Sequence, residues 1–192
     1  MRTLIFATNN DNKAKEIRAA LGGDWEIKTL REAGIEIDIP EPHDTLEANA
    51  REKSVVIRDL TGMDCFSEDT GLEVDALGGA PGVKSARYAG EGRDFSANIS
   101  KLLQGLEGQQ NRKAQFRTVI SYVPGGQEWQ FEGICTGRII EIPRGTDGFG
   151  YDPVFVPDGD TRTFAEMTMA EKNTFSHRKK ALDKLIRFLQ TQ

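Results

Sequence analysis

The first 30 residues alternate between apolar runs typical of strands and apolar positions spaced as on a helix. Residues 3–7 form a short apolar run that predicts a strand, and a polar turn at residues 8–12 follows it. Apolar residues then recur at helical spacing over 14–21 until a Gly-Gly pair ends the pattern. A second strand is expected over residues 25–30.

The middle of the chain predicts a helix with one charged residue on its apolar face, followed by short strands. Lys53 interrupts the face formed by Leu46, Ala50, Ile57 and Leu60. An irregular connector at 40–42 is expected to precede this helix, whose N-cap is Asp44 or Thr45. After the helix, strands at 65–67 and 72–74 are expected to flank a turn at 69–71. A long glycine-rich loop is expected at 78–92.

The second half predicts another amphipathic helix and a β-hairpin. The apolar face of this helix follows the N-cap candidate Asp94 and consists of Phe95, Ile99, Leu102, Leu103 and Leu106. The remaining expected elements are a hairpin of residues 115–123 and 128–135, strands at 137–142 and 153–156, and a closing helix from about Ser176. Because hairpin strands are antiparallel, the expected fold is α/β with a mixed central sheet.

Composition and charge narrow the class of protein. The 192 residues, 38% hydrophobic and 29% charged, suit one globular domain over residues 1–192 that can form two lobes. The net charge of −5 argues against a nucleic-acid-binding protein. Apolar stretches are too short for a membrane span or a secretory signal, so a cytoplasmic protein without membrane contact is expected. Cys65 and Cys135 form no C-x-x-C pair and are expected to be buried and free.

Charge is unevenly distributed along the chain. Residues 32–75 carry thirteen acidic against three basic residues, whereas residues 172–192 carry six basic residues against Asp183 alone. This division of charge is consistent with a protein that binds a hard cation at its acidic part and a polyanion at its basic part. It is equally consistent with two charged surfaces that only face water. His177–Lys180 fall in the first turn of the closing helix, where the helix dipole disfavours cations. A bound anion, or the electron-rich edge of a nucleobase, would explain why basic residues lie there. Full hydration of these side chains would explain it equally well.

Three segments carry candidate chemistry. The strand-to-helix turn at residues 8–13 suits phosphate binding, or is an Asn-rich turn with Asp11 or Asn12 as helix cap. Asp69 is a candidate Mg²⁺ ligand or proton acceptor, or part of an Asx turn that closes a hairpin. Phe149 or Tyr151, among glycines, can present a flat face to a nucleobase, or fold back on the core.

Other catalytic classes lack support. The two histidines, His43 and His177, form no H-E-x-x-H or three-histidine zinc site, and no G-x-S-x-G segment occurs. Asp-Thr-Gly occurs once, whereas an aspartic protease requires a second such loop.

Four segments, in the same order, resemble the Ham1/RdgB family of inosine triphosphate pyrophosphatases, which hydrolyse deaminated purine nucleoside triphosphates. The resemblance runs nearly end to end, and its segments are residues 6–13, residues 67–74 with the glycine-rich stretch 78–90, residues 148–153, and residues 176–178 with 181–182. It implies a mixed α/β fold with two lobes around a nucleotide cleft, a homodimer, and Mg²⁺-dependent release of pyrophosphate that leaves a monophosphate.

The resemblance also implies roles for individual residues. Asp69 and Lys13 would be catalytic, and Glu41 and Asp69 would hold Mg²⁺. The substrate-binding residues would be Thr8, Asn9, Asn10, Asp11, Asn12 and Lys13 at the triphosphate, Thr70, and Phe149, Gly150, Tyr151, Asp152, Lys172, His177 and Arg178 around the base. Donors from His177 or Arg178 would favour the 6-oxo group of inosine or xanthosine over the 6-amino group of adenine.

Three other functions stay open on the sequence. A pyrophosphatase of the Maf kind would act on pyrimidine or modified nucleotides, a nucleotide sensor would bind without turnover, and a nucleic-acid module would bind in a salt-dependent way.

Overall fold

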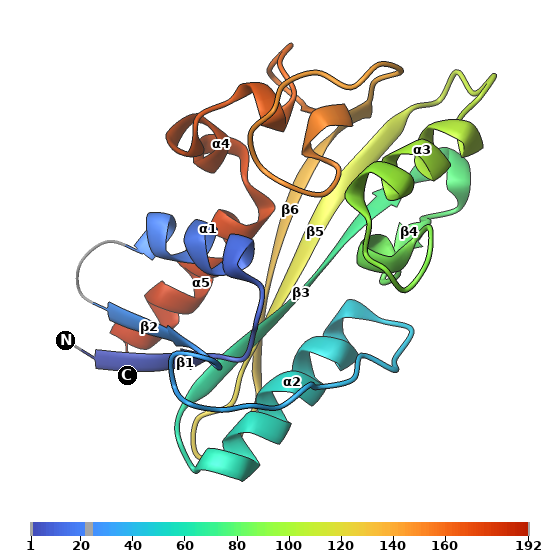
Figure 1. Cartoon of the computed structure of the whole chain (residues 1–192). Helices are drawn as coiled ribbons and strands as arrows, with labels where there is room; N and C mark the ends of the chain where they lie inside the picture. The colour runs from blue at the N-terminus through green and yellow to red at the C-terminus, as the bar shows by residue number, and fades with distance from the viewer. Residues whose placement is uncertain (1, 22–24, 192) are drawn as a thin grey trace. The chain divides into compact units, whose positions relative to one another are not determined.

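The computed structural model describes residues 2–21 and 25–191 of the chain (Figure 1). The chain forms two compact units, each assembled from separate segments. The first unit comprises Met1–Asp69, Thr118–Gly133 and Arg178–Gln192, and the second comprises Thr70–Arg117 and Ile134–His177.

Helices and strands alternate along the chain. The strands are β1 (Arg2–Phe6), β2 (Trp25–Thr29), β3 (Cys65–Val74), β4 (Pro81–Gly82), β5 (Lys113–Tyr122), β6 (Trp129–Ile139) and β7 (Phe155–Pro157). The α-helices are α1 (Asp11–Leu21), α2 (Leu46–Thr61), α3 (Phe95–Gly105), α4 (Met169–Phe175) and α5 (His177–Gln190).

The sheet is mixed, as the sequence predicts. Seven strands in the described part of the chain have the order β2-β1-β3-β5-β6-β7, with β4 paired to β3. β1 runs parallel to β2 and β3, whereas the β3–β4 and β6–β7 pairs are antiparallel. The α/β fold class with a mixed central sheet is therefore confirmed. β3, β5 and β6 are long and contribute residues to both units (Figure 1).

In the first unit, apolar side chains of β1 point alternately to opposite faces of the sheet, as the strand period requires. Leu4 and Phe6 pack with apolar residues of α1 and α5, and the Phe6 ring stacks on Phe66 at 4.6 Å. Ile5 packs on the other face with Ile57 of α2. Helices thus cover both faces of this part of the sheet (Figure 1).

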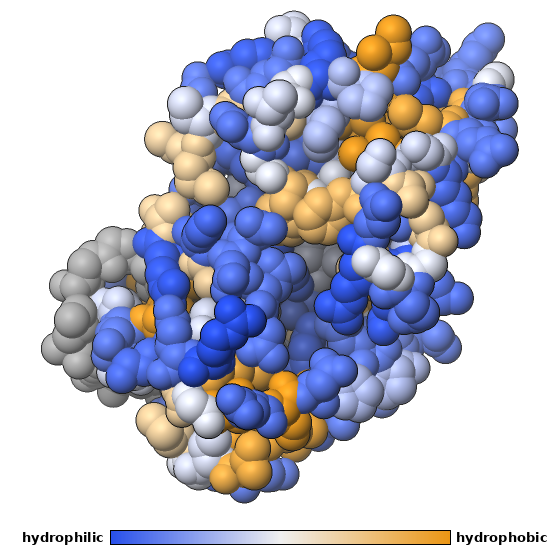
Figure 2. Space-filling model, in the orientation of Figure 1, coloured by the Kyte–Doolittle hydropathy of each residue, from blue (hydrophilic) through white to orange (hydrophobic). Residues whose placement is uncertain are grey.

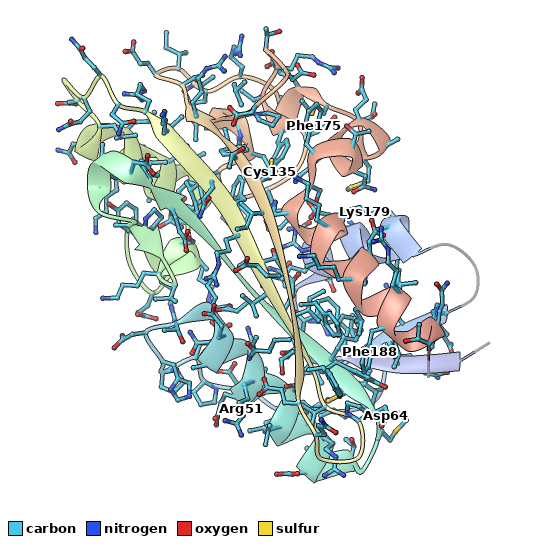
Figure 3. The ribbon with its side chains drawn as sticks, turned by 180° about the vertical axis from the view of Figure 1, so that it is seen from behind. Arg51, Asp64, Cys135, Phe175, Lys179 and Phe188 are labelled. Atoms are coloured by element: carbon cyan, nitrogen blue, oxygen red, sulfur yellow. The ribbon has the colours of Figure 1, made fainter. Side chains whose placement is uncertain are left out.

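An aromatic cluster lies at the C-terminal end of α5 in the same unit. The Phe188 ring lies 4.7 Å from Trp129 and 5.5 Å from Phe131, both on β6. Figure 3 shows Phe188 on the helix face that turns toward these strands.

The second unit has one apolar core. Leu102 and Leu106 of the α3 segment pack with apolar residues of β3, β5, β6 and β7 and with Phe164. Asp94 caps α3 by accepting a hydrogen bond from the Ala97 N–H, as the sequence predicts. This core supports the loop that carries Phe149.

The predicted turn at residues 69–71 is wrong, because β3 runs unbroken from Cys65 to Val74. Gly71 serves a different purpose from a turn. β4 pairs with β3 at this point, and a Cβ on Gly71 would lie 2.6 Å from the Gly82 carbonyl oxygen. Glycine therefore permits close approach of two strands here, and Asp69 lies within a strand, not in an Asx turn.

Other boundaries differ from the sequence prediction. β6 extends to Ile139 without the break expected before residue 137, and a separate helix, α4, precedes α5. The predicted loop at 78–92 contains β4 and the 3₁₀ turn Ser85–Arg87. Strand β7 starts at Phe155, after a 3₁₀ turn over Asp152–Val154, and not at residue 153.

Single residues also match or depart from the sequence prediction. Leu60, placed on the buried face of its helix by the sequence pattern, is 60% exposed. Both cysteines are buried, as predicted, and they form no disulfide within the described part of the chain (Cys135 is labelled in Figure 3). Among the helices of the described residues, none has the length and apolar character that a membrane crossing requires.

Candidate active site

The turn between β1 and α1 is built around Asn10. Its Oδ1 accepts hydrogen bonds from the Asn12 N–H at 3.0 Å and the Lys13 N–H at 3.2 Å. Asn10 is therefore the residue that caps α1, not Asp11 or Asn12. Thr8 Oγ1 in turn accepts from the Asn10 N–H at 3.1 Å. The side chains that make this turn are thus the ones that the resemblance assigns to the triphosphate.

The other residues predicted for the triphosphate lie around this turn. Asn9 Nδ2 donates to the Ile37 carbonyl at 3.4 Å, and Asp11 is exposed at the first position of α1. Lys13 lies in the first turn of the helix with its side chain 17% exposed, and its Nζ is 3.1 Å from Glu68 Oε1.

A buried charge cluster joins this turn to the start of α5 within the first unit. Arg178 holds Glu68 with two parallel hydrogen bonds, Nε to Oε2 at 2.7 Å and Nη2 to Oε1 at 3.0 Å. Its Nη1 also contacts Glu16. The negative partners of this part of the basic cluster are therefore carboxylates of the protein itself.

The pKa of Glu68 reflects these partners. Burial by itself raises the pKa of this carboxyl, but the positive charges of Arg178 and Lys13 outweigh burial and hold it at about 2. Burial lowers the pKa of Arg178, while Glu68 and Glu16 raise it above its ordinary value. Glu68 and Arg178 are thus both charged at neutral pH.

We expect this cluster to make stability sensitive to acid. The Glu68 pKa falls from 4.5 to about 2 on folding. Below pH 4.5 the unfolded chain therefore binds more protons than the folded one, and the free energy of unfolding falls as pH drops from about 4.5 toward 2. Urea denaturation between pH 7 and pH 3 measures this.

The matched variants are Glu68→Gln and Glu36→Gln, the second at an exposed position. Glu68→Gln should be less stable than wild type at pH 7 and should lose stability less steeply below pH 4.5. An acid dependence identical to that of wild type would contradict the assignment.

The second cluster of the first unit consists of Glu41, Lys53 and Asp69. Lys53 Nζ donates to Glu41 Oε1 at 2.6 Å and to Asp69 Oδ1 at 3.1 Å, and its side chain is only 8% exposed. Burial lowers the pKa of Lys53, but Asp69 and Glu41 outweigh it and raise the pKa above its ordinary value. Burial raises the pKa of Asp69, whereas the positive charges of Lys53 and Lys13 act to lower it. A lysine thus bridges the two predicted metal carboxylates.

The connector that carries Glu41 is held by α2. Asn49 Oδ1 accepts from the His43 N–H at 2.9 Å, and Asn49 Nδ2 donates to the His43 carbonyl at 3.0 Å. Thr45 caps the helix by accepting from the Ala48 N–H at 3.2 Å. These bonds place the segment after Pro40 against the helix that carries Lys53.

Sequence reasoning missed Lys53 and Asn49 as site residues. The signal for Lys53 was present, because a charged residue interrupts an apolar helix face only when it has partners there. Asn49 gave no comparable signal, since its partners are backbone groups that only the folded connector supplies.

The donor set of Glu41 and Asp69 fits Mg²⁺ by its chemistry. Carboxylate oxygens are hard ligands, and Mg²⁺ in nucleotide enzymes is commonly held by one or two carboxylates plus substrate phosphates. Over residues 2–21 and 25–191, no group of three or more acidic, histidine or cysteine side chains is arranged to hold a metal. Two carboxylates therefore leave coordination positions that a polyphosphate would fill.

The predicted base-binding loop belongs to the second unit. Asp152 Oδ2 accepts from the Phe149 N–H at 3.0 Å and from Lys172 Nζ at 2.6 Å. Gly148 and Gly150 flank Phe149 with φ of 76° and 63°, and a Cβ on Gly148 would lie 2.1 Å from Asp152 Oδ2. Glycine is therefore required at position 148, and the loop holds Phe149 half-buried.

Tyr151 and His177 are packed into the core of the second unit. The Tyr151 hydroxyl donates to the Ser85 carbonyl at 2.7 Å, and burial raises the pKa of this phenol. The His177 ring is buried and stacks on Phe116 at 4.7 Å. Thr70 lies half-buried on β3.

The predicted residues therefore fall into two groups. Those for the triphosphate and the metal come together in the first unit, with Arg178. Those for the base come together in the second unit around Asp152, Lys172 and Phe149, except Arg178, which lies in the first unit and binds Glu68.

The fold and these clusters define an α/β protein with an Asn10-capped strand-to-helix turn and a lysine-bridged carboxylate pair. The chain belongs to the Ham1 family, whose model matches residues 4–188. It is 48% identical over 186 residues to the dITP/XTP pyrophosphatase of Flavobacterium johnsoniae, covering 97% of each chain. It is 50% identical over 190 residues to the dITP/XTP pyrophosphatase of Porphyromonas gingivalis, covering 98% of each.

Solved structures of the family have the same fold. The Ham1 protein of Staphylococcus aureus superposes with a TM-score of 0.89 at 36% identity and 99% coverage of each chain. A HAM1 protein from Coxiella burnetii superposes with a TM-score of 0.90 at 34% identity and 100% coverage of each.

Proposed function

We propose that this protein is a nucleoside triphosphate pyrophosphatase that hydrolyses dITP, ITP and XTP to the monophosphate and pyrophosphate. The enzyme class rests on membership of the Ham1 family and on the name shared by its relatives. The observation that carries the proposal is the buried Asp69, which Lys53 ties to Glu41. A carboxylate held in this way suits proton transfer from water beside a polyphosphate.

In this mechanism the residues of the first unit bind the triphosphate and activate water. The turn at residues 8–13 offers backbone N–H groups, a hydroxyl and amides to phosphate oxygens. Lys13 adds a positive charge that offsets the charge of the polyphosphate. Asp69 takes a proton from the water that attacks the α-phosphorus, while the bond to the bridging oxygen of pyrophosphate breaks.

Lys53 is a positioning residue in this mechanism. Because its ammonium group binds both Glu41 and Asp69, it holds two like charges side by side in the absence of a cation. Bound at Glu41 and Asp69, Mg²⁺ would supply positive charge to the phosphate oxygens and orient them.

The residues of the second unit would bind the base. Phe149 offers an aromatic face, and Asp152, fixed by Lys172, orients the loop that carries it. Discrimination against adenine would come from donors aimed at the 6-oxo group, because adenine would leave such a donor unpaired. A homodimer and a cytoplasmic location complete the proposal. Light scattering of the purified protein tests the dimer.

The test of the proposed function is a substrate panel. The protein is incubated with Mg²⁺ and, separately, with dITP, ITP, XTP, GTP, ATP and TTP, and released phosphate is distinguished from pyrophosphate. We expect pyrophosphate and monophosphate from dITP, ITP and XTP. ATP should react roughly 5- to 150-fold more slowly, since an unpaired buried donor costs about 1 to 3 kcal/mol. Turnover of pyrimidines alone would indicate a Maf-like enzyme, and absence of any product would refute hydrolysis.

A further inference from the structure

The placement of Phe95 departs from the pattern of its helix. The sequence places it on the apolar face of α3, yet its side chain is 42% exposed and lies outside the core cluster of the second unit. Large hydrophobic residues on the described surface are few and are Leu60, Met63, Phe95, Trp129, Ile142 and Met169. Figure 2 shows one face on which hydrophobic residues form patches in a mainly hydrophilic surface. A single exposed hydrophobic side chain is ordinary on a protein surface, so the neighbours of the Phe95 ring decide whether it has a role.

Phe95 contacts the predicted base-stacking residue. The centroids of the Phe95 and Phe149 rings are 6.2 Å apart, and the planes are inclined by 46°. Lys172 Nζ lies 5.5 Å from the centroid of the Phe149 ring, while it donates to Asp152. The partly exposed Phe149 thus has an ammonium group on one side and a second exposed aromatic ring beside it.

The backbone at Phe95 is anchored by hydrogen bonds on both sides of this residue. Asp94 caps the helix immediately before it. One turn later, Asn98 Oδ1 accepts from the Ala89 N–H at 2.6 Å, and Asn98 Nδ2 donates to the Ala86 carbonyl at 3.0 Å. These bonds tie the preceding segment to α3. Hydrogen bonds on both sides of Phe95 therefore hold the backbone from which its ring reaches Phe149.

We propose that Phe95 is a specificity-determining residue, a second aromatic wall for the purine base of the substrate. Two inclined aromatic rings form an apolar corner, and a two-ring purine covers more of it than a one-ring pyrimidine. Binding removes the exposed ring of Phe95 from water, which favours the base-bound state. The inference rests on the proposed function, because Phe149 is the base-stacking residue only there.

The experiment compares wild type with Phe95→Ala, Phe95→Tyr and Trp129→Ala. Trp129 is the control, since it is an aromatic residue of similar exposure in the first unit. KM and kcat are measured on ITP, dissociation constants are measured for IMP by titration, and inhibition is measured with inorganic tripolyphosphate, which has no base. For Phe95→Ala we expect KM for ITP and the dissociation constant for IMP to rise about 5- to 10-fold, as for loss of an aromatic stacking contact. The value of kcat and inhibition by tripolyphosphate should not change.

The outcomes separate this inference from the proposed function. Phe95→Tyr should restore wild-type IMP affinity, because it retains the ring. Unchanged IMP affinity in Phe95→Ala overturns the inference even if wild type hydrolyses ITP, and so does equal weakening of tripolyphosphate inhibition. A changed oligomeric state with unchanged IMP affinity also overturns it. If wild type binds IMP without hydrolysing ITP, the proposed hydrolysis fails and the titration still decides the role of Phe95.

Discussion

Replacing Asp69 with Asn is expected to lower kcat on dITP by about 10³-fold or more while nucleotide binding is retained. General-base catalysis contributes roughly 10²- to 10⁴-fold, and the substitution also removes a negative charge from the predicted metal site. Asn retains an oxygen that can accept the hydrogen bond from Lys53 Nζ, now 3.1 Å from Asp69 Oδ1. Because the shape of the site is kept, the loss should fall on turnover and not on binding.

The measurement is steady-state hydrolysis of dITP with titration of IMP binding. Asp64→Asn is the matched control, since Asp64 lies next to the start of β3 and is exposed (Figure 3). It should retain wild-type kcat. A rate near that of wild type in Asp69→Asn would remove Asp69 from the mechanism.

Replacing Arg178 with Met is expected to lower the free energy of unfolding by about 3 to 5 kcal/mol. The guanidinium group is buried and binds Glu68 and Glu16, so its loss leaves two buried carboxylates without their main counter-charge. For a domain of this size, such a loss corresponds to a fall in Tm of roughly 10 °C. Thermal unfolding followed by circular dichroism measures it.

Two further variants test whether the buried charge cluster is the cause of the lost stability. Arg187→Met changes an exposed arginine on the same helix and should leave Tm nearly unchanged. Adding Glu16→Gln to Arg178→Met should recover part of the lost stability, because one uncompensated charge is removed. If Arg178→Met were as stable as Arg187→Met, the buried cluster would not be the source of stability.

Much of the local structure followed from the sequence. The Asp94 cap, the helix after it, the hairpin of β5 and β6 and the strand–turn–helix at the N-terminus all match the pattern of residues. These features depend on neighbours a few positions apart, because strand and helix periodicity and capping bonds are local. The family also followed from motifs whose order along the chain is readable without a structure.

Other features could not be read from local pattern. Gly71 suggested a turn, whereas the approach of β4 makes it part of a continuous strand. The basic residues at the start of α5 suggested an external anion or hydration, whereas Arg178 meets Glu68, 110 positions earlier in the chain. Phe95 suggested a core residue, yet it lies exposed beside Phe149.

By itself, the sequence determined the mixed α/β class, most of the helices and strands, and the identity of the residues available for a nucleotide site. The tertiary structure alone decided which of these residues meet. It paired Lys53 with Glu41 and Asp69, and Arg178 with Glu68. The reason is physical: the energy of a buried charge depends on partners brought together by folding, and spacing along the chain contains no direct record of those partners.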